Sequence, residues 1–301
     1  MIYEFAVEPS LLCNWAQFNH LIEKFGFQQG RLISRCPTRW ENAVKEVLKT
    51  ANVTVMQRQK MIEILANIDH KMVARDVQWL LNLDWLENAE RAHAKHAFHA
   101  ILANKNPRNH GFVLPYEDLT EDNALWATQS QRVVQRQAAE MARTLLPVFR
   151  IAVRLVFIDP NFDPCKAPAM RALKAYLRQC RTISPYPQIE YHTKFNPGNT
   201  LFKSKCMELE SSIPVGQKIT MICWENQNIT GKPRDGMHNR YVLTNRGGLS
   251  LGWGLDEGKV GQTDDVIILT QDVYKERWEQ YCGTTPAFTK TLAFPINGNA
   301  S

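Results

Sequence analysis

Residues 236–256 read GMHNRYVLTNRGGLSLGWGLD. Two short apolar runs, 240–244 and 248–251, flank a turn that contains two consecutive glycines, a pattern typical of a β-hairpin. Because side chains alternate along a strand, His238 and Arg240 lie on the same face of the first strand. An imidazole can attack phosphorus or transfer a proton, and a guanidinium can bind non-bridging oxygens. The pair therefore suits a phosphate-containing ligand.

The sequence on either side of this hairpin predicts a mixed sheet with helices. A β-branched apolar run over 151–158 ends at the turn residues Asp159 and Pro160, and a helix is expected over 167–180. The runs over 151–158 and 240–244 are short and almost wholly apolar, so both should be central strands. Further strands are expected over 188–194, 218–225 and 266–269, and a closing helix over 273–281.

The first half of the chain has a different pattern. Apolar residues recur at helical spacing over 40–48, 74–102 and 123–146, and β-branched runs are scarce. We therefore expect an α+β protein with two domains, a helical domain over 1–147 and an α/β domain with a mixed central sheet over 148–301.

Composition narrows the class of protein. The 301 residues are 44% hydrophobic and 22% charged, which excludes a disordered chain, and no apolar run is long enough to span a membrane. The seven cysteines form no ligand-spaced pair, and the first residues do not resemble a signal peptide. We therefore expect a cytoplasmic protein with reduced thiols that needs no metal and no cofactor. A net charge of +6 permits a polyanionic partner without requiring one.

The hairpin resembles a degenerate form of the phospholipase D signature, H-x-K-x(4)-D followed by a glycine-rich second strand. Here the pattern is His238-x-Arg240-x(4)-Asn245, with Gly252 at the glycine of the second strand. The segment is also similar to phospholipase-D-like proteins found beside bacterial antiphage defence genes. It is similar too to the phospholipase-D-like C-terminal domain of MIT-domain proteins. The resemblance covers about 148–285.

This resemblance implies roles for individual residues. His238 would be the nucleophile, Arg240 would bind phosphate, Asn245 would orient the imidazole, and Gly252 would lie against the phosphate. Asp159 is a further candidate for substrate binding, because ligands often bind at the carboxyl ends of strands; capping of the turn is the alternative role.

Three departures from the family bear on activity. Asn245 cannot stabilise an imidazolium as a carboxylate does, and Trp253 stands where a small serine is expected. The family needs two signatures and this chain has one, so a working site would require a homodimer. A second pattern, His192-x-Lys194-x(4)-Asn199, begins only 46 residues before His238, and we interpret it as coincidental.

Two functions remain open. In the first, the chain is a component of a bacterial antiphage defence system whose degenerate site is inactive and recognises nucleic acid or another protein of a defence complex. In the second, it is an active, metal-independent nuclease or phosphodiesterase, a homodimer that acts through a phosphohistidine at His238.

Overall fold

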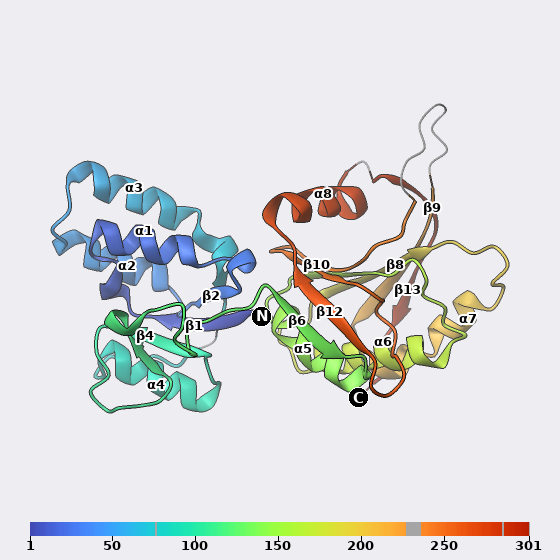
Figure 1. Cartoon of the computed structure of the whole chain (residues 1–301), viewed down its shortest axis with the longest axis horizontal. Helices are drawn as coiled ribbons and strands as arrows, with labels where there is room; N and C mark the ends of the chain where they lie inside the picture. The colour runs from blue at the N-terminus through green and yellow to red at the C-terminus, as the bar shows by residue number, and fades with distance from the viewer. Residues whose placement is uncertain (76, 227–235, 285, 301) are drawn as a thin grey trace. The chain divides into compact units, whose positions relative to one another are not determined.

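The computed structural model describes residues 1–75, 77–226, 236–284 and 286–300. The chain folds as two compact units, Met1–Ser130 and Gln131–Ser301, and each combines helices with a β-sheet (Figure 1). The expectation of a mixed α/β chain is confirmed in this general form. The expectation of a helical first half is wrong.

The first unit is built on a five-stranded parallel sheet in the order β3-β2-β1-β4-β5. Its strands are β1 (Tyr3–Val7), β2 (Arg31–Ser34), β3 (Met72–Val73), β4 (Ala100–Ala103) and β5 (Val113–Pro115). Its helices are α1 (Trp15–Lys24), α2 (Trp40–Thr50), α3 (Val55–Ala66) and α4 (Trp85–Lys95).

Apolar side chains cover both faces of this sheet. Phe5 and Val7 of β1 belong to the core formed with α1, α2 and α3. Ala6, between them, belongs to a second core that includes Ala89 of α4. The alternation along β1 thus fills two cores, as expected for parallel strands covered by helices on both sides.

The strands of the first unit explain why the helical expectation fails. They are two to five residues long and almost wholly buried, so they lack the alternation of polar and apolar residues that identifies a half-buried strand. In the described part of the segment 74–102, expected as one helix, the chain forms α4 and then enters β4. Two alanines in β4, Ala100 and Ala103, also have low strand propensity. The helix expected over 40–48 is confirmed as α2.

The second unit is built on an eight-stranded mixed sheet in the order β13-β9-β8-β7-β10-β11-β12-β6. Its strands are β6 (Gln131–Gln135), β7 (Arg154–Ile158), β8 (Gln188–Lys194), β9 (Lys218–Asn226), β10 (Arg240–Thr244), β11 (Gly248–Leu251), β12 (Thr263–Ile268) and β13 (Phe288–Asn297). Its helices are α5 (Ala138–Arg150), α6 (Ala167–Cys180), α7 (Phe202–Met207) and α8 (Gln271–Cys282). Strands β7, β8 and β9 are parallel, and the other neighbours are antiparallel.

Strands β7 and β10 are both central in this sheet, as the sequence predicts, and they pair with each other. On one face, Phe157 of β7 contacts Phe149 of α5 and Tyr176 of α6. On the other face, Val156 shares a core with Tyr274 of α8. Four of the five residues in each central strand are buried, so these strands form the core of the unit.

The division between the units falls after residue 130 and not near 147. Strand β6 pairs with β12, and α5 runs past Pro147 to Arg150, so both elements belong to the second unit. Among the described residues, no helix combines the length and the apolar composition that a membrane span requires.

Candidate binding site at the carboxyl edge of the second sheet

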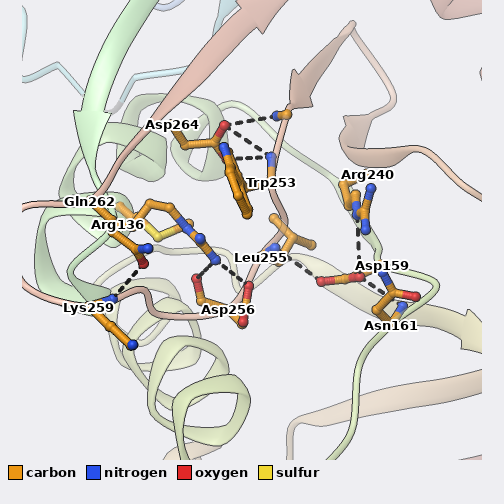
Figure 2. Close-up of polar contacts among 12 residues, drawn as sticks. Arg136, Asp159, Asn161, Arg240, Trp253, Leu255, Asp256, Lys259, Gln262 and Asp264 are labelled. Carbon is orange, nitrogen blue, oxygen red and sulfur yellow. Dashed lines mark hydrogen bonds and ion pairs between the residues drawn. The ribbon is translucent and has the colours of Figure 1, made fainter.

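The topology of the second sheet brings distant segments to one edge. Parallel strands β7 and β8 both end there, and antiparallel strand β10 begins there, opposite the last residue of β7. Strand β11 pairs with β10 and ends at the same edge, where Arg240 lies opposite Leu251. Asp159, Arg240 and the loop 252–256 are therefore neighbours in space (Figure 2).

Asp159 is a buried anchor at this edge. Its side chain is 5% exposed, and its two oxygens accept hydrogen bonds from the backbone N–H of Asn161 (2.9 Å) and of Leu255 (3.0 Å). Burial raises the pKa of Asp159, although the two N–H groups and the cation of Arg240 oppose that shift. Nε of Arg240 lies 3.9 Å from Oδ1. The carboxylate of Asp159 thus caps its own turn, which is the alternative role, and also holds the loop at Leu255. Binding of a substrate by Asp159 stays a prediction.

The loop 252–256 is held at several points. Oδ1 of Asp264 accepts hydrogen bonds from the backbone N–H groups of Gly252 and Trp253, each at 3.1 Å. The hydroxyl of Tyr176 donates to the carbonyl of Leu255 at 3.0 Å. The backbone N–H of Gly252 is therefore already paired within the protein, and a place for Gly252 against a phosphate stays a prediction.

Glycine is required at the middle of this loop. Gly254 has a φ of +152°, and a Cβ atom there would lie 2.9 Å from Oδ1 of Asp256. The backbone angle is strained for any residue with a Cβ atom, and the close approach would also displace the Asp256 carboxylate.

Trp253 does not fill the site. Its side chain is 67% exposed, and the guanidinium of Arg136 lies 5.5 Å from the ring centroid. The same guanidinium binds Oδ1 of Asp256 at 2.7 Å, and Arg171 forms an ion pair with Glu257. Both acids of this loop region are therefore paired with arginines, so they do not prevent an anion from approaching; Figure 2 shows the pair of Arg136 and Asp256.

His238 and Asn245 lie at opposite ends of β10. His238 precedes the strand and is exposed, and its ring makes no hydrogen bond to another described residue. Asn245 follows the strand, and its Oδ1 accepts hydrogen bonds from the N–H groups of Val153 (2.9 Å) and Arg154 (3.3 Å). Five strand residues span about 17 Å, so Asn245 cannot orient the imidazole, and the role implied for it is corrected.

The sequence did not reveal a cavity of about 600 Å³ at the same edge. It is formed by the segments that follow β7 and β8, and three phenylalanines, three asparagines and two lysines line it. Lys166 and Lys194 are exposed, and neither forms an ion pair with a described residue. Asp163, the one acid in the lining, has an oxygen that accepts hydrogen bonds from Asn199 and from the N–H of Cys165. The lining thus combines unneutralised cations with aromatic rings.

Two of these residues belong to the pattern that was interpreted as coincidental. Lys194 and Asn199 line the cavity, while His192 is buried beneath α8 and binds Glu190 at 3.0 Å. Lys194 ends the buried parallel strand β8 and Asn199 lies in the loop after it, and this position at the carboxyl end of a strand is the feature that could have identified them.

Within the described ranges, no group of three or more His, Cys, Asp or Glu side chains is arranged to hold a metal ion. Comparison of the whole chain with protein-family models, curated proteins and solved structures gave no match.

Proposed function

We propose that the second unit is a phospholipase-D-like module with a degenerate site, which binds the phosphodiester chain of a nucleic acid without cleaving it. The observation that carries this proposal is the group of cations at one sheet edge: Arg240 beside Asp159, and Lys166 and Lys194 in the adjacent cavity. The resemblance of the 236–256 segment to phospholipase-D-like proteins of antiphage loci supports a role in a bacterial defence system.

The charges of the site favour an extended anion. Arg240 is half-buried, and its Nε lies 3.9 Å from Oδ1 of Asp159 without a hydrogen bond. The planar fork of N–H donors on its guanidinium suits the oxygens of a phosphate group. The lysines are flexible point charges and suit neighbouring phosphates of the same chain.

Turnover is disfavoured by the surroundings of His238. A phosphohistidine mechanism requires a partner that fixes the imidazole tautomer and stabilises its charge. The described residues place no hydrogen-bonding partner on this ring, and Asn245 is at the far end of β10. The module therefore recognises the phosphodiester bond without a correctly held nucleophile.

An active homodimeric nuclease is the second candidate. The observation in its favour is that His238 is exposed two residues before Arg240, where a second copy of the chain could reach it. In that case a histidine of each copy would act at one phosphorus, one as nucleophile and one as acid.

Binding and cleavage can be measured on the same samples. Full-length protein is titrated with fluorescent DNA and RNA strands in EDTA, and the strands are then resolved on a denaturing gel. We expect binding without cleavage, a loss of about tenfold in affinity for Arg240→Ala, and less than twofold for His238→Ala. Arg143→Ala is the control, because Arg143 is an exposed arginine of α5. Cleavage in EDTA that disappears in His238→Ala would instead establish the nuclease.

A further inference from the structure

We infer that the ligand is single-stranded, with one base stacked on Trp253 and another base in the cavity beside Phe195. This inference rests on the proposed function, since the phosphates between the bases would bind Arg240. It adds the class of nucleic acid and the residues that select it.

Trp253 is an exposed aromatic ring on a rigid backbone. Its side chain is 67% exposed, which leaves most of the ring in water. The backbone N–H of Trp253, in contrast, donates to both carboxylate oxygens of Asp264, at 3.1 Å each, and Asp264 is 5% exposed. The ring is thus presented to solvent from a fixed position, which lowers the entropic cost of binding a ligand to it.

Arg136 supports the same ring from within the protein. Its side chain is only 6% exposed and is fixed by its ion pair with Asp256, and its guanidinium lies 5.5 Å from the centre of the indole. A cation at this distance is attracted to the aromatic ring and restricts its movement. Trp253 is therefore suited to stack with a planar group from solvent.

The cavity offers a second position for a base. Its volume of about 600 Å³ falls within the range of about 300–1,000 Å³ for small-molecule sites. Phe162 and Phe202 contact each other at 6.3 Å, whereas Phe195 is half-buried and has no ring–ring contact with a described residue. Phe195 is thus available to a ligand, and Lys194 precedes it in the chain to bind the adjoining phosphate.

The two positions are joined through Asp159. One oxygen of Asp159 accepts a hydrogen bond from Leu255, two residues after Trp253, and the other accepts one from Asn161, which lines the cavity. Figure 2 shows Trp253 and Asn161 on opposite sides of the contact between Leu255 and Asp159. Nε of Arg240 lies 3.9 Å from the same carboxylate. The cation of Arg240 is therefore close to the segments that carry Trp253 and the cavity.

Exposed aromatic positions favour a single strand. In a duplex both faces of each base are covered by neighbouring bases, whereas a single strand can unstack and place its bases on protein rings. Phosphate contacts alone would not distinguish the two forms in this way.

The test compares three probes with the full-length protein: an oligothymidylate, an abasic strand of the same length, and a duplex of the same length. We expect the oligothymidylate to bind about a hundredfold more tightly than the abasic strand, because two stacked bases contribute about tenfold each, and about tenfold more tightly than the duplex. Trp253→Ala and Phe195→Ala should each weaken oligothymidylate binding about tenfold and leave abasic binding unchanged. Trp253→Phe should restore most of the affinity, and Val260→Ala, at a residue that is 91% exposed, is the control.

The outcomes separate the two proposals. Equal affinity for the abasic strand and the oligothymidylate, or tighter binding of the duplex, would overturn the inference and leave phosphodiester recognition standing. Absence of binding to all three probes would contradict the proposed function itself. The comparison of probes uses the unmodified protein, so it does not depend on whether a variant folds.

Discussion

Glu190 is a buried carboxylate at the centre of a charged cluster in the second unit. Its oxygens bind Arg154 at 2.8 and 3.0 Å, and Nε2 of the buried His192 lies 3.0 Å away. Burial alone would raise the pKa of Glu190, but the hydrogen bonds from His192 and Arg154 outweigh it and lower the pKa to about 2. Burial lowers the pKa of His192, although Glu190 opposes that shift.

The lowered pKa values of Glu190 and His192 both make the protein less stable in acid. The unfolded chain, with ordinary pKa values of about 6.5 for histidine and about 4.3 for glutamate, binds protons before the folded chain does. The free energy of unfolding should therefore fall as the pH drops below about 6.5, and should fall further below about 4.3.

Glu190→Gln should reduce the free energy of unfolding by about 3 kcal/mol at pH 7, because Arg154 loses its counter-charge and the buried His192 loses a charged hydrogen-bond partner. The difference from the wild type should shrink toward pH 2, where the native glutamate is itself becoming protonated. Urea denaturation over this pH range measures it. Glu208→Gln, at an exposed ion pair with Lys205, is the control and should change little. A Glu190→Gln effect that is the same at every pH would contradict this account.

At the scale of the element, Asn245 joins the end of β10 to the start of β7. Asn245→Ala would leave the N–H groups of Val153 and Arg154 without this acceptor, so we expect a loss of about 1 kcal/mol in stability. Affinity for nucleic acid should stay within twofold, because the binding edge is at the other end of the strand. Thermal denaturation and anisotropy measure the two effects separately.

Asn245→Asp provides the matched comparison. A carboxylate can accept both hydrogen bonds, so this variant should recover most of the lost stability and gain no cleavage activity. Cleavage in EDTA that appears in Asn245→Asp would show that residue 245 orients His238, against the geometry described above.

The same elements show how far the sequence predicts this structure. Strands β8, β10 and β11 lie where their apolar runs predict, since buried strands bounded by turn residues have clear limits. The sequence does not predict strand β13, because six of its ten residues are exposed and it contains Pro295, a residue that strands accept only at a sheet edge. The strands of the first unit were missed because short, fully buried strands carry no alternation.

Of the candidate site, the sequence predicts only the residues that belong to the β10–β11 hairpin. His238 and Arg240 are neighbours on one strand, so their proximity follows from local sequence. The cavity lies between the loop that follows β7 and the loop that follows β8, and a hydrogen bond between Asp163 and Asn199 connects these two loops. The loops are neighbours because β7 and β8 pair in parallel. No local pattern in the sequence specifies that pairing.

At the scale of the whole molecule, the boundary after residue 130 can be tested with fragments. A fragment of residues 131–301 should unfold cooperatively, because it keeps β6 and all of α5. A fragment of residues 148–301 should aggregate, because it loses the partner of β12 and the buried Met141 and Leu145. Circular dichroism melts of both fragments measure this. Equal stability of the two would contradict the assignment of β6 and α5 to the second unit.

The central claim is that the carboxyl edge of the second sheet binds the phosphodiester chain. The most direct measurement is the salt dependence of oligothymidylate binding to full-length wild type and to the double variant Lys166→Ala, Lys194→Ala. Each lost phosphate contact should reduce the slope of log affinity against log salt by about 0.7, so the double variant should show a distinctly shallower slope. Lys203→Ala is the control. Lys203 belongs to α7, lies over the ring of Phe294 and is not part of the cavity lining. A slope that is unchanged in the double variant, or reduced equally in the control, would contradict the claim.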